Sequence, residues 1–228
     1  MHLVLSGEGN SDIGKLSYAS NEFIPASMYY LIDKIIEKKL NYSFYGLTPE
    51  LITFVPKAEL TKIGNKLPPY TGKKIKKGQA LFLINAITLA KVAKNKSKEL
   101  SDDDVIAILF RDSDGTNSTA KGMWEDKVES IENGFKMEKF IKGVAMIPKP
   151  KSEAWLICTL KKKPYENCHK LEDRSGNDKS PNNLKYELES FSIELETINE
   201  MIQDGRIDID KIDMPSFEYF SEKLSNLL

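Results

Sequence analysis

Two short acidic motifs carry the residue types in this chain that are best suited to chemistry. Glu8 and Asp12 follow an apolar run near the start of the sequence. Asp112 and Asp114 follow a second apolar run at 105–110. Four carboxylates brought together repel one another strongly unless a cation lies between them. Mg²⁺ is a hard ion that takes oxygen ligands of this kind. The pattern therefore predicts a site for phosphate chemistry that depends on Mg²⁺ or Mn²⁺.

Buried strands of a parallel sheet would bring the two motifs together. Runs rich in Val, Ile, Leu and Phe that stop at Gly or Asp are typical of strands covered on both faces. Ligands of open α/β sheets lie just beyond the carboxyl ends of such strands. We therefore expect an α/β fold with a mainly parallel sheet flanked by helices. The expected strands are 3–6, 50–55, 105–110 and 144–147, and the expected helices are 26–39, 78–98, about 124–135 and 152–160.

The segments between and after these elements differ in character. A basic loop is expected from Pro56 to about Lys77, and Ser152 is expected to cap the helix that it begins. A polar, mobile loop is expected at 161–183, followed by a helical, acidic C-terminal extension with an apolar face on its last helix, formed by Phe217, Phe220 and Leu224. The chain thus divides into an α/β domain at 1–160 and a loop with a helical extension at 161–228 that packs on it.

Composition and charge fit a globular protein. Of the 228 residues, 40% are hydrophobic and 29% are charged, and the net charge of −1 does not by itself indicate nucleic acid. The charge is uneven, with a net +10 from Lys57 to Lys98 and −8 from Glu187 to Leu228. The basic block is either a set of solvated faces or a grip on a phosphate backbone. In the second case, the contacts to nucleic acid would come from Lys73, Lys74, Lys76 and Lys77.

The two cysteines and the absence of long apolar runs bear on location. No apolar stretch is long enough to span a bilayer, and Glu8 interrupts the first run, so we expect neither a membrane anchor nor a secretory signal. A cytoplasmic location follows, with Cys158 and Cys168 as free thiols. A structural zinc site is not expected because such sites need four ligands and histidines are scarce.

Three motifs together resemble those of a known superfamily. The sequence Glu-Gly-Asn-Ser-Asp at 8–12 resembles the glutamate motif of TOPRIM domains, and Asp-Ser-Asp at 112–114 resembles their paired-aspartate motif. The spacing of Glu8 and Asp12 is similar to the E-x-x-x-D form of OLD-family nucleases. The sequence Ile-Pro-Lys-Pro-Lys-Ser-Glu-Ala-Trp-Leu at 147–156 resembles a later motif of small, stand-alone TOPRIM-like proteins of unassigned function. The resemblance covers about residues 1–160.

The resemblance implies metal-dependent phosphodiester hydrolysis of nucleic acid, within a defence or repair assembly. The OLD family's ATPase domain, the tyrosine-bearing domain of topoisomerases and the zinc module of primases have no counterpart here, so an ATPase or another protein is an implied partner. The implied metal ligands are Glu8, Asp112 and Asp114, with Asp12 and Glu153 added by analogy with the nuclease branch. The implied catalytic residues are Glu8, Asp112, Asp114 and Lys151, and Lys149 is implied in binding the phosphate backbone.

Two other functions remain open. The chain could be a TOPRIM-like subunit that binds nucleic acid or a protein without cutting. The motif D-x-D-G-T that begins at Asp112 also matches haloacid-dehalogenase-like phosphatases, in which Asp112 would attack phosphorus and Asp114 would act as acid and base. That fold requires a later lysine and then an acidic pair after another strand, whereas the strand at 144–147 leads into Pro148-Lys149-Pro150.

Each acidic residue also has a purely structural interpretation. Glu8 could be a turn residue, and Asp112 and Asp114 could cap a following helix. Asp12 could simply begin a helix. Glu153 is favourable near a helix N-terminus without any metal, because it complements the helix dipole.

Overall fold

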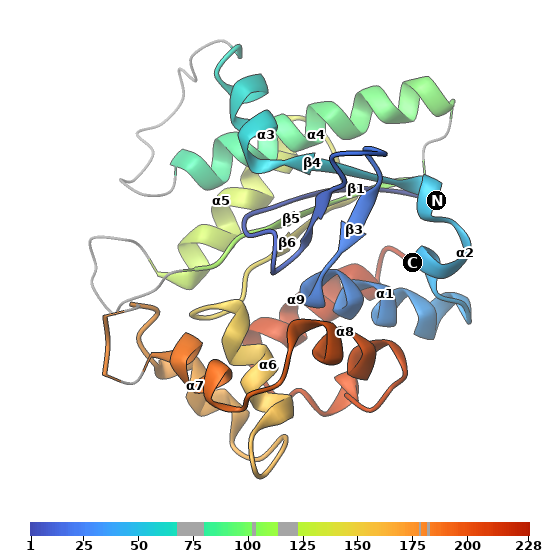
Figure 1. Ribbon diagram of the computed structural model, residues 1–228. Coiled ribbons are helices and arrows are strands. Elements are labelled where there is room, and N and C mark those ends of the chain that lie inside the picture. The colour runs from blue at the N-terminus through green and yellow to red at the C-terminus, as the bar shows by residue number, and fades with distance from the viewer. Residues whose placement is uncertain (68–79, 102–103, 114–122, 178, 182) are drawn as a thin grey trace.

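A four-stranded parallel sheet forms the centre of the molecule, and helices cover both of its faces (Figure 1). The computed structural model describes residues 1–67, 80–101, 104–113, 123–177, 179–181 and 183–228. The strands of this sheet, in their spatial order, are β4 Ile52–Pro56, β1 His2–Gly7, β5 Val105–Phe110 and β6 Gly143–Met146. The prediction of an α/β fold with a mainly parallel sheet is confirmed.

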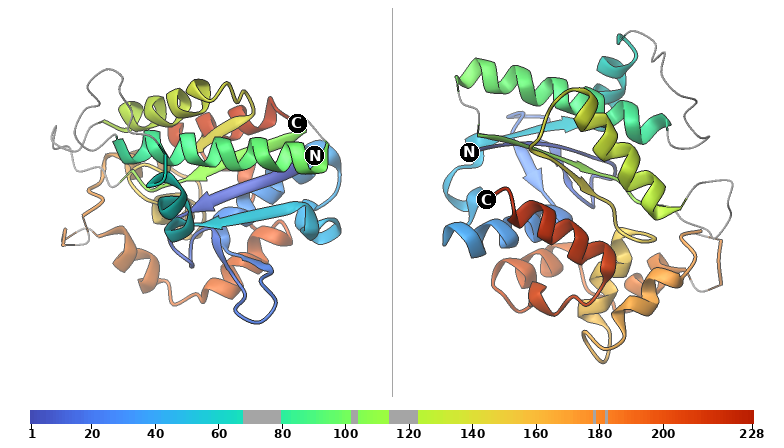
Figure 2. Two further views of the ribbon diagram at one scale, coloured as in Figure 1. Left: turned by 90° about the horizontal axis from the view of Figure 1, so that it is seen from above. Right: turned by 180° about the vertical axis from the view of Figure 1, so that it is seen from behind.

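The strand register places the carboxyl ends of the strands at one edge. Leu5 of β1 lies opposite Phe54 of β4 on one side and Ile108 of β5 on the other. Ile108 in turn lies opposite Val144 of β6. The arrowheads of β1 and β4 point the same way in the left view of Figure 2. Residues that follow β1, β4, β5 and β6 are therefore brought to a common edge.

The helices divide between the two faces of the sheet. α3, α4 and α5 lie on one face, and α1, α6, α8 and α9 lie on the other (Figures 1 and 2). The helices are α1 Ser27–Leu40, α2 Phe44–Leu47, α3 Lys57–Gly64, α4 Ala80–Leu100, α5 Trp124–Met137, α6 Ser152–Leu160, α7 Leu184–Ser190, α8 Leu195–Gln203 and α9 Pro215–Ser225, with the 3₁₀ helices η1 Pro49–Leu51, η3 Cys168–Asp173 and η4 Ile209–Lys211.

The central strands are apolar on both faces, which explains why their sequences show no alternation of apolar and polar residues. Ala107 and Leu109 of β5 pack in the hydrophobic cluster under α4 and α5. Ile106 and Ile108 of the same strand pack in the cluster on the opposite face. Successive side chains of a strand point to opposite faces. A strand covered on both sides is therefore continuously apolar, as this run is.

Several short elements were not predicted, among them α2 and η1, and the strand predicted at 50–55 begins only at Ile52 because η1 covers Pro49–Leu51. A small antiparallel hairpin, β2 Gly14–Leu16 and β3 Phe23–Pro25, lies between β1 and α1. The predicted basic loop after Pro56 is wrong in its first part, because α3 begins directly at Lys57. Proline ends the strand, but its fixed φ also suits the start of a helix.

The C-terminal helices share a core with the rest of the chain. Phe217, Phe220 and Leu224 of α9 are buried in the same hydrophobic cluster as Leu3 and Leu5 of β1, which confirms the predicted apolar face of the last helix. The hydrophobic effect therefore holds the C-terminal helices to the sheet as one continuous core.

The predicted polar loop at 161–183 contains an ordered 3₁₀ helix, η3, and contributes buried groups. The carboxylate of Glu172, which is 7% exposed, accepts a hydrogen bond of 2.7 Å from the backbone N–H of Ser216 at the start of α9. The hydroxyl of Ser216 accepts one of 2.9 Å from the indole of Trp155 in α6. A buried carboxylate is stable at a helix N-terminus because it satisfies an unpaired N–H there.

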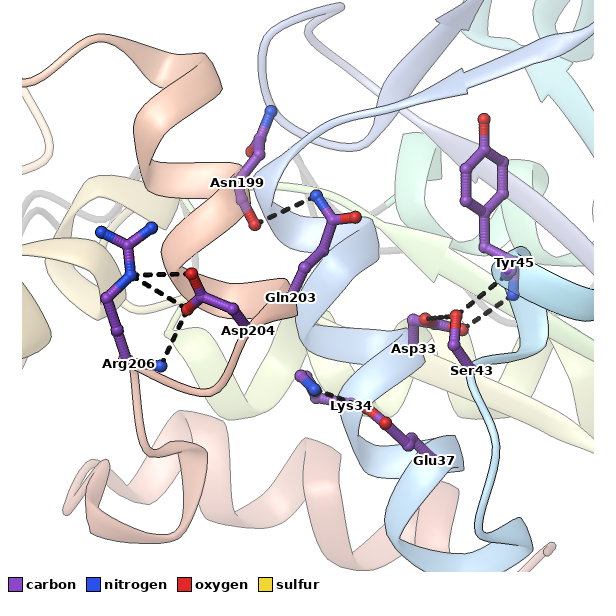
Figure 3. Close-up of polar contacts among 10 residues, drawn as sticks. Asp33, Lys34, Glu37, Ser43, Tyr45, Asn199, Gln203, Asp204 and Arg206 are labelled. Carbon is purple, nitrogen blue, oxygen red and sulfur yellow. Dashed lines mark hydrogen bonds and ion pairs between the residues drawn. The ribbon is translucent and has the colours of Figure 1, made fainter.

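A similar long-range cap fixes the turn between α1 and α2. The buried carboxylate of Asp33 accepts hydrogen bonds from the hydroxyl of Ser43, at 2.6 Å, and from the backbone N–H of Tyr45, at 3.0 Å (Figure 3). One side chain thus ties the start of α2 to the middle of α1.

Cys158 in α6 and Cys168 in η3 form a disulfide, with their Cα atoms 5.2 Å apart. The prediction of two free thiols is wrong. It rested on the assumption of a reducing compartment, which the cysteines therefore do not support. Within the part of the chain that the structure describes, every helix is too short or too polar to cross a lipid bilayer.

Candidate functional site at the carboxyl edge of the sheet

The segment from Gly7 to Asp12 carries two of the predicted acids, and its local geometry depends on two glycines. Gly7 is packed so tightly that a Cβ atom there would lie 2.3 Å from the side chain of Ile13. Gly9 has a φ of +82°, and a Cβ atom on it would lie 1.9 Å from a carboxylate oxygen of Asp12. Glycine is required at position 7 because there is no room for a Cβ atom. It is required at position 9 because residues with a side chain disfavour positive φ. Gly9 therefore makes room for the Asp12 carboxylate, and Gly7 makes room for the side chain of Ile13.

The end of β5 places Asp112 beside Glu8. The backbone N–H of Asp112 donates a hydrogen bond of 3.3 Å to Oε1 of Glu8. The carboxylate Oδ1 of Asp112 accepts a hydrogen bond of 2.9 Å from the backbone N–H of Ser152, the first residue of α6. The sheet thus brings together two acids that are more than a hundred positions apart in the sequence, as the parallel arrangement predicts.

Ser152 links Asp112 to Asp12. Its hydroxyl donates to Oδ1 of Asp12 at 2.9 Å, and it lies 3.4 Å from Oε2 of Glu153. The prediction that Ser152 caps α6 is wrong, because the N-cap position belongs to Lys151. The N-terminal N–H of α6 is capped instead by Asp112, which comes from the sheet.

We refer to Glu8, Asp12, Asp112 and Glu153 as the acidic edge. Its electrostatics appear most clearly at Asp12, whose pKa is raised to about 6, chiefly by burial and further by the charges of Glu153 and Glu8. The hydrogen bond from Ser152 and the charge of Lys151 act in the opposite direction. Burial therefore contributes most to the raised pKa of Asp12, and the neighbouring carboxylates add to it.

Two cations lie beside Glu8. The ammonium of Lys57, at the start of α3, lies 2.5 Å from Oε2 of Glu8 and is half exposed. The guanidinium of Arg111 is 1% exposed, and burial lowers its pKa to about 10, although the charge of Glu8 acts against this shift. Its Nη1 donates to the carbonyl of Phe110 at 2.7 Å, whereas Nε and Nη2 have no partner among the described residues.

Backbone hydrogen bonds hold the end of β5 in place. The N–H of Arg111 donates to the carbonyl of Met146 at 3.1 Å, and the N–H of Ser113 donates to that of Pro148 at 3.2 Å. The hydroxyl of Ser113 donates to the carbonyl of Pro150 at 3.0 Å, and the buried ammonium of Lys127 donates to the carbonyl of Ser113. The backbone next to Asp112 is therefore fixed to the β6–α6 connection.

The structure links four of the predicted site residues, those of the acidic edge, through backbone N–H groups and the side chain of Ser152. Lys151 is close enough to affect Asp12 electrostatically, and Lys149 lies in the β6–α6 connection with a partly exposed side chain. The remaining predicted site residues lie outside the described residues, namely Asp114, Lys73, Lys74, Lys76 and Lys77.

The chemistry of these ligands fits a hard divalent cation, since all four side chains of the acidic edge offer carboxylate oxygens. Their convergence is incomplete. Among the residues that the structure describes, no three His, Cys, Asp or Glu side chains lie close enough together to hold a metal ion. Both oxygens of Glu8 are engaged, one by Lys57 and one by the N–H of Asp112.

Sequence reasoning missed three residues of this site. Lys57 was assigned to a loop, although its position after the second strand could have placed it at the carboxyl edge. Arg111 follows the apolar run at 105–110 directly and precedes Asp112, and a charged residue at the end of a buried strand was a signal in the sequence. The role of Ser152 as a bridge between two acids had no local signal, because both partners are distant in the sequence.

Comparisons of this chain with protein-family models, with curated proteins and with solved structures found no match. What the site can do is therefore inferred from its own residues.

Proposed function

We propose that the acidic edge is the centre of a Mg²⁺-dependent phosphodiesterase that hydrolyses nucleic acid, as the resemblance to TOPRIM nucleases implies. The observation that carries the proposal is the chain of contacts from Glu8 through Asp112 and Ser152 to Asp12. It joins the ends of two central strands and the start of α6. Glu8 in this network is paired with Lys57, whereas Asp12 is buried beside the charges of Glu153 and Glu8, and acids with a pKa shifted in this way are enriched at functional sites.

The residues fall into distinct roles in this proposal. Glu8 and Asp112, together with Asp114, would hold one ion, and Asp12 and Glu153 would hold a second. A bound Mg²⁺ supplies a water of lowered pKa and neutralises charge on the phosphate. Lys151 lies next to the acids and would attract the phosphate electrostatically.

Asp12 adds a proton-linked step to cation binding. Its pKa of about 6 means that part of the protein carries a protonated Asp12 at slightly acidic pH. A divalent cation favours the charged carboxylate, so binding would release that proton. Arg111 stays buried beside Glu8 and provides fixed positive charge, which offsets part of the repulsion within the acidic edge.

The phosphatase alternative is less well supported by the topology. In that mechanism an acidic pair follows another strand later in the chain. Among the described residues, no strand follows β6, and the connection after β6 contains Pro148, Lys149 and Pro150. The carboxylate of Asp112 also caps α6, an arrangement that uses the oxygen of a would-be nucleophile to satisfy a helix N-terminus.

The test is incubation of the full chain with supercoiled plasmid, with single-stranded DNA and with RNA, each with Mg²⁺, Mn²⁺ or EDTA. Metal-dependent cleavage of at least one of these polymers is expected. Metal binding without cleavage favours a non-catalytic subunit. Hydrolysis of a small phosphate monoester without polymer cleavage favours the phosphatase, and in either case the proposal fails.

A further inference from the structure

A cavity of about 340 Å³ opens beside Asp12, on the side of the acidic edge that faces the C-terminal helices. Asp12, Ser152 and Glu153 form one wall of it. The other walls come from the start of α1, from α7, from the α7–α8 connection and from α8. Its volume lies in the range of pockets that hold small organic ligands, roughly 300–1,000 Å³.

The inner walls of the cavity are apolar and firmly held. Met28, Leu156 and Ile198 line it and are buried. The backbone N–H of Met28 donates to the carbonyl of Asp12 at 2.9 Å. Next to it, the hydroxyl of Ser27 in α1 donates to the side chain of Asn199 in α8 at 2.7 Å. The cavity is thus formed between elements that are bonded to one another.

The rim of the cavity is more open than its interior. Ile193, in the connection between α7 and α8, is half-buried, and Leu195 is 39% exposed. A ligand could therefore enter past the α7–α8 connection without displacing core residues.

The charges around the cavity limit which ligands it can take. Its acidic lining residues are Asp12, Glu153, Glu189 and Glu194, and Lys185 is the one cation among the described residues that line it. An anion such as phosphate would be repelled from the interior. A neutral, flat ring with apolar faces and polar edges fits both the apolar walls and the hydroxyl and carboxylate groups at the mouth.

We propose that this cavity binds the nucleobase next to the phosphodiester that the acidic edge cleaves. The proposal rests on the proposed function, because it assigns the base to the cavity and the phosphate to the acidic edge that shares Asp12 and Glu153 with it. Enzymes that act on nucleic acid commonly take a base out of the stack into a pocket lined by apolar groups. The substrate is then single-stranded, or becomes so locally.

The test measures binding of uncharged nucleosides to the full chain in EDTA, by saturation-transfer NMR. The probes are adenosine, guanosine, cytidine, uridine and thymidine, which carry the base without a phosphate. At least one should bind the unmodified protein with a Kd on the order of 0.1–1 mM, as expected for a ligand of this size.

Two variants fill the cavity from its rim, and a third serves as a matched control. Ile193→Trp and Leu195→Trp place an indole in the cavity at positions that are not part of the buried core. Leu47→Trp adds the same side chain in α2, where Leu47 is 67% exposed and does not line the cavity. Thermal unfolding of each variant shows whether it is folded.

Binding of the best nucleoside should weaken by about tenfold or more in a folded cavity variant, a change equivalent to the loss of one good contact, and should persist in Leu47→Trp. Equal binding in all variants, or no nucleoside binding to the unmodified protein, overturns the proposal. Because the assay contains neither metal nor cleavable substrate, its result does not depend on nuclease activity. A cleaving enzyme without a base site and a base-binding protein without cleavage are therefore told apart.

Discussion

Acidic residues at the two edges of the sheet lie in different electrostatic environments. At the amino edge, Asp104 precedes β5, and its carboxylate lies 2.9 Å from the ammonium of Lys142. That hydrogen bond lowers the pKa of Asp104. At the carboxyl edge, the pKa of Asp12 is raised to about 6, mainly by burial, with the charges of Glu153 and Glu8 adding to the shift. At the amino edge the acid is paired with a cation, whereas at the carboxyl edge Glu8 has such an ion pair and Asp12 is buried beside further carboxylates.

The two acids contribute to the free energy of unfolding with opposite sign. A paired, partly exposed acid such as Asp104 stabilises the folded state slightly. A buried acid beside like charges destabilises it, and such groups cluster at functional sites. The comparison thus separates an acid that is stabilised by an ion pair from an acid whose charge is destabilised by burial and by like charges.

Removing the charge of Asp112 at the carboxyl edge should have the greatest effect on activity. Asp112→Asn should lower metal-dependent cleavage by ~10²-fold or more, because it removes a charge from the proposed cation site. The amide oxygen can still accept the hydrogen bond from Ser152, so the fold should remain. Cleavage rates under substrate saturation provide the measurement. Asp104→Asn is the matched control and should leave cleavage unchanged; a fully active Asp112→Asn protein excludes that residue from the site.

The pH dependence of stability should differ in sign between the two acids. Because the pKa of Asp12 is about 6 in the folded protein and 3.8 is the ordinary value of this group, the folded state binds the proton more tightly than the unfolded state does. Stability should therefore fall as pH rises from about 4 to about 6, by up to about 3 kcal/mol from this group. Asp12→Asn should lack this loss and be more stable than the unmodified protein at pH 7.

Asp104 should show the reverse. Its lowered pKa means that its contribution is present above its unfolded pKa and is lost as pH falls below that value. The loss in Asp104→Asn should stay below about 1 kcal/mol, since the pair is partly exposed. Urea unfolding at a series of pH values measures both effects. If Asp12→Asn is no more stable than the unmodified protein at pH 7, the charged carboxylate of Asp12 does not destabilise the folded state.

A smaller effect is expected at Lys57. Its ammonium lies 2.5 Å from Glu8 and competes with any cation that Glu8 would bind. Lys57→Met should therefore tighten Mg²⁺ binding by roughly threefold to tenfold, the range expected for loss of one partly exposed charge. Calorimetric titration measures it, with Lys62→Met in the same helix as control. Weaker Mg²⁺ binding in Lys57→Met would show that Lys57 supports the site and does not compete with the ion.

The smallest effect is expected from Ser152→Ala. The hydroxyl of Ser152 donates to Asp12 and holds the pKa of that carboxyl down. Without it, the pKa of Asp12 should rise further, and the pH midpoint of the stability loss should move upward. NMR titration of the Asp12 carboxyl carbon follows this directly. Thr159→Ala in the same helix is the control, because its hydroxyl bonds the carbonyl of Leu156 and not an acid. A midpoint unchanged in Ser152→Ala would remove Ser152 from the electrostatics of the site.

The sequence predicted the parts of the fold that depend on long apolar runs. The strand at 105–110 was placed with the bounds that the structure shows, because six consecutive apolar residues leave few alternatives. α3 and the β2–β3 hairpin were missed since they are short and their stability comes from packing on the sheet. Leu60 of α3, for example, is buried against residues of β1 and β4.

The sequence indicated which acidic residues belong to the candidate site, but it did not indicate the contacts that join them. Gly-flanked Glu8 and the strand-end position of Asp112 are local signals, and parallel pairing brings these residues together. The capping of α6 by Asp112, the bridge through Ser152 and the disulfide between Cys158 and Cys168 depend on tertiary contacts. No local pattern specifies such contacts, because each partner is chosen by the packing of other elements.

The most direct test of the central claim is calorimetric titration of the full chain with Mg²⁺ at pH 6, in two buffers of different ionisation enthalpy. If acids from distant segments form the two proposed cation sites, Mg²⁺ should bind, binding should release a fraction of a proton from Asp12, and the site that contains Asp112 should bind at least about tenfold more weakly in Asp112→Asn. Absence of Mg²⁺ binding, or equal affinity in Asp112→Asn, would contradict the claim.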